Sequence, residues 1–486
     1  MRLAESSTAT ALAAAAAASG ASLDACCARL ASALGDIVTT TPFAESDYFS
    51  LQESTLVPTC IVRPRSAQDV SRAVTILSTA RTPGCQFAVK GGGHTPAGGS
   101  ANIQGGVTID MTSLNATVLS GDGTSVAVGA GAVWNDVYGY LDEYNLAAAG
   151  GRNGLVGVGG LLLGGGISHF SPRVGWACDG VVEYEVVLAN GTLVNVSATS
   201  HPDLYRALKG GGNNFGVVTR YDLKTFPQGN MSASTISYDI SQAGAVFDAF
   251  TDIAASPNFD PYVSLQTGLL YASAANAWSL SSSAFYTKPV LHPEVYSKLE
   301  AVPSISNTSE ITAVAALAAE NPTPPLNWLF ATLTFGTSSE AMLDIFKTLN
   351  ASLYDFNPAG GVTWNFAFEP LPSVMLSYAN ATGGNVLGLS PEDGNGVILL
   401  FSALWSNSSS NDSIYRKGRD AFLAVRDVAE RNGVLRKFEY LNYAGPHQSP
   451  LASYGKDSLD FLRQVSRKYD PTGVFQHKVP GGFKLW

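Results

Sequence analysis

The stretch that decides the fold is Phe87-Ala88-Val89-Lys90-Gly91-Gly92-Gly93-His94. Its apolar beginning predicts a buried strand, and its glycines predict a tight turn, because glycine accepts positive φ and brings no side chain. Successive backbone N–H groups in such a turn can point at one spot and form a nest for a pyrophosphate group. A plain turn is the alternative for a triple glycine taken alone, so the role of His94 depends on the rest of the chain.

A second glycine-rich segment, GGRNGLVGVGGLLLGGG, spans residues 150–166. It does not match the dinucleotide-binding fingerprint GxGxxG, because Leu162 stands where the third glycine is required. No lysine follows that would make it a P-loop. The segment therefore predicts a long backbone platform on which a flat or phosphorylated cofactor can lie.

Helices and strands alternate around these two glycine segments. Apolar periodicity and turn residues predict strands at 60–62, 87–89, 107–111, 125–128, 181–188, 192–196 and 217–223, and helices at 23–35, 67–77, 133–144 and 202–208. This pattern predicts an α+β unit that ends near Pro227.

The middle third of the chain has fewer glycine clusters and more aromatic residues. Alternating runs at 328–335 and 397–405 predict strands of an antiparallel sheet, and 338–349 and 414–431 predict helices that back it. We therefore expect a second domain here.

Several motifs occur in an order that resembles a known family. They are PTCIVRP at 58–64, GGGH at 91–94, VGVGG at 156–160, CDGVV at 178–182 and DLYRALKGGGNNFG at 203–216. In this order the chain resembles the FAD-linked oxidases with a vanillyl-alcohol-oxidase-type, or PCMH-type, FAD-binding domain. The C-terminal motifs NY at 442–443, YG at 454–455 and KYDP at 468–471 narrow the resemblance to the berberine-bridge-enzyme-like group.

The resemblance implies an α+β fold of two domains. Residues 47–230 would form the PCMH-type FAD-binding domain, residues 231–430 a substrate domain with an antiparallel sheet backed by helices, and residues 431–486 a segment that completes the FAD domain. It also implies FAD bound covalently through a histidine, a role that the motif assigns to His94. Covalent attachment would retain the cofactor and make it a stronger hydride acceptor. Further cofactor contacts are then expected from Lys90, Gly91, Gly92, Gly93, Thr95, Gly98, Gly157, Gly159, Gly160, Gly164, Ser168, Asp179 and Val182.

The chain departs from the family pattern at two positions. Many members have a second flavin bond from a cysteine that is Asn153 here, so we expect a single linkage. Three residues later, Val156 takes the position that gates dioxygen beside the flavin; packing under the flavin ring is the alternative for this side chain. The aspartate that often follows the Asn-Tyr pair is Gly445 here, which leaves no carboxylate of the family type to assist Tyr443.

Tyr443 is the predicted base for the substrate proton, and Asn442 beside it is expected to make a backbone or flavin-edge contact. An unperturbed tyrosine has a pKa of about 10, so it would need a nearby positive charge to act at neutral pH. Arg436 and Lys437 are close in sequence. The alternative is a core tyrosine that only hydrogen-bonds the flavin. His169, which follows the glycine platform, is a weaker candidate for a residue that faces the flavin.

These features predict an FAD-dependent oxidase. A small organic substrate, such as a sugar, an alcohol or a secondary metabolite, would lose hydride to the flavin and a proton to the base, and O2 would reoxidise the flavin to give H2O2. There are two alternatives: an FAD dehydrogenase that uses another acceptor, and a secreted ligand-binding glycoprotein with little turnover. No HExxH or similar spacing predicts a metal site. The net charge of −10 and the absence of Lys/Arg runs exclude nucleic acid as an expected partner.

The N-terminus and the glycosylation motifs predict secretion. Arg2, an alanine-rich run at 9–18 and Ser19-Gly20-Ala21 outline a signal peptide over residues 1–21, although a leader with no targeting role fits as well. The longest apolar run, 155–163, is too short to span a membrane. The motif Asn-x-Ser/Thr occurs at Asn115, Asn190, Asn195, Asn230, Asn307, Asn350, Asn380, Asn407 and Asn411.

The five cysteines contain no CxxC pair, which argues against a zinc or thioredoxin-like site. In an oxidising compartment we expect one disulfide, from Cys26 or Cys27 to Cys60, which would tie an N-terminal helix to the folded domain. The odd number of cysteines leaves at least one thiol unpaired.

Overall fold

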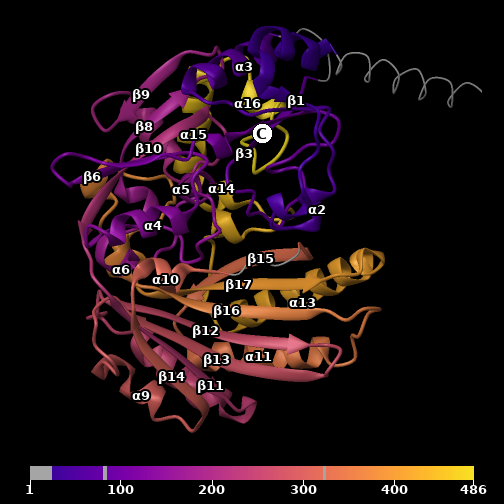
Figure 1. Ribbon diagram of the computed structural model, residues 1–486. Helices are drawn as coiled ribbons and strands as arrows, with labels where there is room; N and C mark the ends of the chain where they lie inside the picture. Colours follow the sequence, from indigo (N-terminus) through magenta and orange to yellow (C-terminus); the bar gives the residue numbers. More distant parts are fainter. Residues whose placement is uncertain (1–24, 80–84, 321–324) are drawn as a thin grey trace, which may run out of the picture.

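The computed structural model describes residues 25–79, 85–320 and 325–486. Figure 1 shows two halves: the upper one contains the first part of the chain and its last residues, and the lower one is built from the middle of the chain. Helices are combined with two antiparallel sheets and one smaller, mainly parallel sheet, and the predicted α+β class is confirmed.

The upper half contains two sheets. The first has the order β1-β2-β4-β3, in which the last three strands are parallel, and comprises Val38–Thr39, Cys60–Val62, Val107–Asp110 and Phe87–Lys90. The second is antiparallel and has the order β5-β6-β10-β8-β9, with β7 also paired to β10, and comprises Thr117–Leu119, Ser125–Gly129, Val217–Pro227, Val181–Val187, Leu193–Ser197 and Leu146–Ala148.

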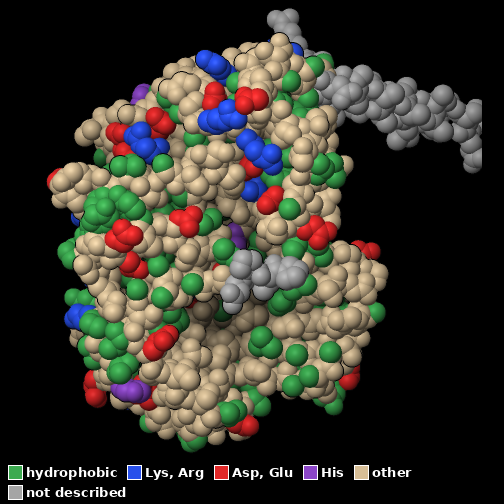
Figure 2. All heavy atoms as spheres, in the orientation of Figure 1, with side chains coloured by type: hydrophobic (Ala, Val, Ile, Leu, Met, Phe, Trp, Pro, Cys, Tyr) green, Lys and Arg blue, Asp and Glu red, His purple; other side chains and the backbone are tan. Residues whose placement is uncertain are grey.

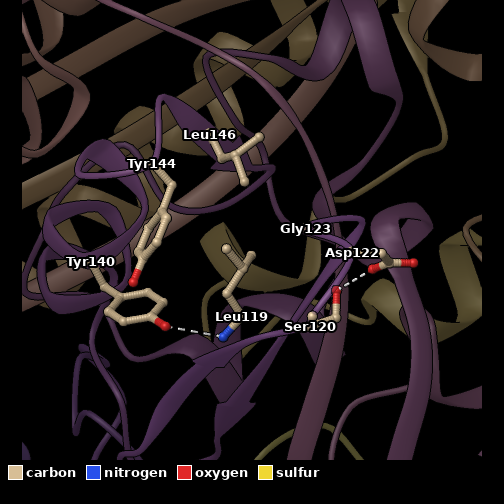
Figure 3. Close-up of a pocket in the computed structure, with 8 residues that line it drawn as sticks. Leu119, Ser120, Asp122, Gly123, Tyr140, Tyr144 and Leu146 are labelled. Atoms are coloured by element: carbon tan, nitrogen blue, oxygen red, sulfur yellow. Dashed lines mark hydrogen bonds between the residues drawn. The ribbon is translucent and has the colours of Figure 1, made fainter.

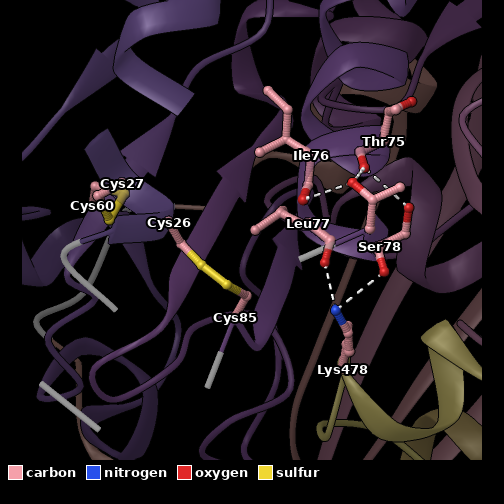
Figure 4. Close-up of a disulfide and its surroundings, with 10 residues drawn as sticks. Cys26, Cys27, Cys60, Thr75, Ile76, Leu77, Ser78, Cys85 and Lys478 are labelled. Atoms are coloured by element: carbon pink, nitrogen blue, oxygen red, sulfur yellow. Dashed lines mark hydrogen bonds between the residues drawn. A yellow bond between two sulfur atoms is a disulfide. The ribbon is translucent and has the colours of Figure 1, made fainter. Parts of the chain in front are cut away.

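Helices complete the upper half. They are α2 Leu51–Ser54, α3 Ala67–Thr79, α4 Trp134–Asp142, α5 Val158–Leu163, α6 Ser171–Val174, α7 Pro202–Leu208, α14 Pro450–Ser453, α15 Lys456–Tyr469 and α16 Val474–His477. The C-terminal segment is held at the first sheet by Lys478. Its Nζ donates to the carbonyls of Leu77 and Ser78 at 2.7 and 3.2 Å, at the end of α3 (Figure 4). Its own carbonyl accepts from Phe87 N at 2.7 Å.

The lower half is an eight-stranded antiparallel sheet of order β14-β11-β13-β12-β16-β17-β15-β18. The strands are Ser304–Thr312, Met231–Tyr238, Ala277–Tyr286, Val263–Ala272, Thr363–Leu371, Gly396–Trp405, Asn327–Gly336 and Leu435–Arg436. Three long helices cover one face: α8 Ala243–Ala254, α11 Ser339–Leu353 and α13 Asn411–Arg431. Shorter helices are α9 Ser297–Glu300, α10 Val314–Ala318 and α12 Ser373–Leu376.

Strand β16 shows why the two faces of this sheet differ. Side chains alternate along a strand, so Trp364, Phe366 and Phe368 all enter the helix-covered core. Asn365 and Glu369 alternate with them and lie on the opposite face, which is turned toward the upper half. The polar side chains Asn365 and Glu369 thus lie on the face of the sheet that is turned toward the glycine loops.

The cysteine prediction is partly corrected. There are two disulfides rather than one: Cys27 pairs with Cys60, as one of the two expected pairings, and Cys26 pairs with Cys85 (Figure 4). Both hold the helical residues 25–34 against the first sheet. Cys178 is buried and free, which confirms the unpaired thiol. The predicted signal peptide lies outside the described residues, and none of the described helices is both long and apolar enough to cross a membrane.

Candidate active site

The two glycine segments meet backbone against backbone. A Cβ on Gly92 would lie 2.6 Å from the Cα and the N of Gly157, so neither loop could carry a side chain there. Gly93 has φ +67°, the left-handed conformation that the turn after β3 requires. Among the described residues, no acceptor faces the backbone N–H groups of residues 91–94. Backbone donors in a glycine turn of this kind can bind an anion, and a pyrophosphate group fits the cradle.

His94, at the end of the first glycine loop, is part of a stack of rings. Its imidazole lies parallel to Phe49 at a centroid distance of 4.0 Å, and Phe49 stacks in turn on Trp328 of β15 at 4.5 Å. Burial lowers the pKa of His94 to about 4, so the ring is neutral at physiological pH. A neutral imidazole keeps one nitrogen lone pair free, as a nucleophile needs.

A buried polar cluster lies where the glycine platform meets the open face of the sheet. Glu369 of β16 is only 1% exposed, and its Oε1 accepts hydrogen bonds from Arg152 Nη2 at 2.7 Å, Gln266 Nε2 at 3.0 Å and the Tyr443 hydroxyl at 3.1 Å. Arg152 Nη2 also donates to the Tyr443 oxygen at 2.7 Å. Glu369 Oε2 is buried and has no partner among the described residues, so this carboxylate retains an unused acceptor.

The surroundings of Tyr443 differ from the sequence-based expectation. The positive charge beside it is Arg152, not Arg436, whose guanidinium donates to the carbonyls of Gly394 and Asn395 at 3.1 and 2.6 Å. Burial, followed by the charge of Glu369, raises the pKa of Tyr443 well above its usual value, and Arg152 only partly opposes this. The hydroxyl therefore stays protonated, and a stable phenolate is not the resting state.

Sequence reasoning missed Arg152 and Glu369, although each carried a signal. Arg152 is the only charged residue of the glycine platform, and Glu369 is the only one in the otherwise uncharged run 363–371. A lone charge in a segment that must be buried needs a partner of opposite sign, and these two residues are that pair.

Asn442 and His169 lie at the border of this cluster. The Asn442 amide donates to Leu161 O and to the Tyr440 hydroxyl, both at 3.0 Å, and a side chain at Gly164 would collide with it. His169 Nδ1 is 2.9 Å from Ser264 Oγ of β12. Burial, with the charge of Arg152, lowers the pKa of His169 to about 3, so this histidine is neutral.

The other residues expected at the cofactor differ in burial and in their contacts. Lys90 is buried and lies 3.5 Å from Asp110, Asp179 accepts from Trp176 N at 3.0 Å, and Ser168 Oγ accepts from Gly150 N at 3.1 Å. Val182 is 43% exposed on β8. Thr95 and Val156 are partly buried. Three of the glycines lie close to other residues: Gly91 to the Ala130 carbonyl, Gly98 to Gln52 and Gly159 to Tyr221. A Cβ built on Gly160 would have no neighbour within 4 Å.

Of two hollows on the surface, only the one between the two halves lies beside the predicted site residues. Figure 2 shows the molecule hollowed where the halves meet. The second depression, of about 580 Å³, is lined by the β5–β6 turn and α4 (Figure 3). Hydrogen bonds from Ser120 and Thr124 lower the pKa of its only carboxyl group, Asp122, to about 2. This depression holds none of the predicted site residues, and the described residues contain no cluster of metal-binding side chains.

Comparisons with known proteins agree with a flavin site at the glycine loops. The sequence profile described as FAD binding domain matches residues 58–197. The FAD-dependent monooxygenase tpcD of Cochliobolus heterostrophus is 39% identical over 462 residues, which cover 90% of this chain and 87% of that protein. The FAD-dependent monooxygenase sdcF of Emericella nidulans is 38% identical over 474 residues, or 95% of this chain and 98% of that protein.

Solved structures share the fold at lower sequence identity. Xylooligosaccharide oxidase from Myceliophthora thermophila C1 superposes with a TM-score of 0.77 at 20% identity, covering 95% of this chain and 99% of its own. The 6-hydroxy-D-nicotine oxidase of Arthrobacter nicotinovorans gives a TM-score of 0.75 at 21% identity, covering 92% and 97%.

Proposed function

We propose, since this chain belongs to the family of FAD-linked oxidoreductases with a PCMH-type FAD-binding domain, that it oxidises a small organic molecule at a flavin bound covalently to His94. Bound FAD would supply a two-electron acceptor for hydride. The glycine cradle supports the position of the pyrophosphate, and the neutral, stacked imidazole of His94 supports attachment at this residue. Because Asn153 replaces the second attachment residue of many relatives, His94 is the only proposed link.

The observation that carries the proposal is the Tyr443–Glu369–Arg152 cluster. Tyr443 donates its proton toward Glu369 and accepts a hydrogen bond from Arg152, so the hydroxyl can take a substrate proton while it passes its own to the carboxylate. Arg152 contacts both the Tyr443 oxygen and the Glu369 carboxylate, so it stabilises the negative charge on either residue. Glu369 is thus the final proton acceptor, Tyr443 the relay, and the raised pKa of the tyrosine is no obstacle.

The sheet face beside this cluster supports a small substrate with polar groups. Asn365 and Ser402 lie opposite each other on β16 and β17, with 3.4 Å between Nδ2 and Oγ, and Phe330 is the register partner of Ser402 on β15. Phe330 and Tyr443 are in edge-to-face contact at 6.5 Å. An aromatic wall next to amide and hydroxyl groups suits a sugar, an alcohol or a hydroxylated aromatic compound.

The first experiment is a screen for H2O2 release over sugars, alcohols and amines with the purified yellow protein in air. A substrate should also bleach the flavin when oxygen is absent. If no compound bleaches a correctly loaded protein and candidate ligands still bind, the protein is a ligand-binding module and the proposal is wrong.

A second candidate function, substrate monooxygenation, is favoured by the names of the relatives at 38–39% identity. An oxidase releases one H2O2 for each O2 that it consumes, whereas a monooxygenase places one oxygen atom in the product and needs a reductant. Turnover under 18O2 separates the oxidase from the monooxygenase: label in the product, with little H2O2, would replace the oxidase proposal.

We also propose that the protein is secreted, which the two disulfides and the glycosylation motifs support.

A further inference from the structure

The outermost strand of the large sheet is unusually open. β14, Ser304–Thr312, ends the strand order and pairs only with β11 among the described residues. Nearly all of its side chains are exposed, including Ile305 at 72% and Ile311 at 44%, and Glu310 is its only charged residue. A long edge strand of this kind presents a row of unpaired N–H and C=O groups to any other strand.

In natural proteins, lysines, prolines and β-bulges keep edge strands from pairing with other chains, and few of these features are present in β14. β14 contains no lysine and no proline, and its single register shift lies at one end, opposite Ser237 and Tyr238. Its β-branched residues favour the extended conformation. Unprotected, this edge would pair with a second copy of the chain.

A glycosylation motif lies in the middle of the same strand. Asn307-Thr308-Ser309 matches Asn-x-Ser/Thr, Asn307 is exposed, and its Nδ2 has no acceptor among the described residues. By contrast, the partly buried Asn407 donates its Nδ2 to Ala359 O at 3.1 Å. Asn307 therefore offers an exposed amide nitrogen that makes no hydrogen bond within the described part of the chain, whereas the Asn407 amide is partly buried and already engaged.

We propose that Asn307 carries an N-linked glycan, and that this glycan covers the free edge of β14 and prevents two copies from pairing there. The attachment forms a bond between Asn307 Nδ2 and the anomeric carbon of an oligosaccharide, breaks the bond from that carbon to its lipid-pyrophosphate carrier, and releases one amide proton. The glycan is bulky and strongly hydrated, so a second strand could not approach the middle of the edge. The proposal rests on the secretory route proposed above.

The test begins with the full chain secreted from a eukaryotic host. Peptide mass mapping before and after glycosidase treatment should find a glycan on Asn307 and none on Asn407. Glycans on other motifs with a bare Asn307 would overturn this proposal alone, whereas a secreted protein without any glycan would overturn it together with glycosylation as a whole.

Association in solution tests the role of the glycan. Asn307→Gln should form dimers or larger species at concentrations where the wild-type protein stays monomeric, as measured by light scattering after size-exclusion chromatography. Asn115→Gln, which removes an exposed motif outside β14, is the matched control and should stay monomeric. Adding Ile305→Lys to Asn307→Gln should restore the monomer, because a lysine on the edge resists strand pairing. A monomeric Asn307→Gln protein, or failure of the lysine to restore the monomer, would overturn edge protection.

Discussion

Single substitutions at Tyr443 and Glu369 test the proposed proton relay. Tyr443→Phe removes the hydroxyl but keeps the Arg152–Glu369 ion pair, whereas Glu369→Gln keeps the hydroxyl and removes the charge that receives its proton. Both variants should bind flavin and stay yellow, and both should slow flavin reduction by substrate about a hundredfold or more, because a proton acceptor is lost. Anaerobic stopped-flow absorbance measures the rate.

The matched control is Arg436→Gln, which changes a nearby cation that bonds backbone carbonyls outside the cluster. It should reduce its flavin at the wild-type rate. A near-normal rate in Tyr443→Phe would exclude the relay and leave Tyr443 as a packing residue.

The Phe49–His94 stack predicts how much flavin becomes covalently bound. His94→Ala should hold FAD through the glycine cradle but release all of it on acid precipitation, and Phe49→Leu should lower the covalent fraction because the imidazole loses the ring that orients it. Trp328→Leu removes a ring from the same stack without touching His94, so it should keep more covalent flavin than Phe49→Leu. Peptide mass mapping gives the attachment site, and flavin on any cysteine would contradict a single histidine link.

Substitutions at Val156 test whether this side chain controls the access of O2 to the reduced flavin. It lies in the glycine platform, one residue before the Gly157 that contacts Gly92. A bulkier Val156→Leu side chain should slow reoxidation of the reduced flavin by O2, and Val156→Ala should not. Equal reoxidation rates in stopped-flow mixing with aerated buffer would show that Val156 only packs.

At the scale of elements, α2 clamps the loop that follows His94 through one buried carboxyl group. Glu53 accepts hydrogen bonds from the backbone N–H groups of Gly99, Ser100 and Ala101 at 3.2, 2.8 and 2.7 Å, yet burial raises its pKa from 4.5 to about 7. Between these two values the folded chain keeps a proton that the unfolded chain has lost. The free energy of unfolding should therefore fall as pH rises from 4.5 to about 7, by about 3 kcal/mol from this group.

Urea unfolding of the wild type and of Glu53→Gln from pH 4 to pH 8 measures this contribution. The amide cannot ionise, so the variant should lack the component of the pH profile that Glu53 supplies. Parallel profiles in the two proteins would contradict the assignment.

The elements themselves were largely predictable, whereas the contacts between distant ones were not. β2, β3 and α3 follow from local patterns, because an apolar run, a glycine turn and an amphipathic period each act within a few residues. Glu369 could not be placed beside Arg152 in the same way, since that contact depends on the order of eight strands and on which face of β16 is left open by the helices. The raised pKa of Tyr443 likewise comes from burial, which no neighbouring residue in the sequence reveals.

At the scale of the whole molecule, the two disulfides are expected to stabilise the folded chain. Cys26–Cys85 and Cys27–Cys60 close loops with sequence separations of 59 and 33 residues. Loss of either by Cys85→Ser or Cys60→Ser should lower the free energy of unfolding by about 2–4 kcal/mol, because the unfolded chain regains freedom. Thermal unfolding compares each variant with Cys178→Ser, which removes the free buried thiol and leaves both bridges intact. A Cys85→Ser protein as stable as the wild type would contradict the second bridge.

The position of Lys478 has a consequence for biosynthesis. The Nζ of this residue donates to carbonyls in the last turn of α3, and its carbonyl accepts from the N–H of Phe87, the first residue of the strand that leads to His94. It is synthesised almost four hundred residues after that strand. The contacts that Lys478 makes with α3 and β3 therefore form long after these two elements have been synthesised. We therefore expect a chain cut before Lys478 to bind FAD less well than the full chain, which the flavin absorbance of the two purified proteins would measure.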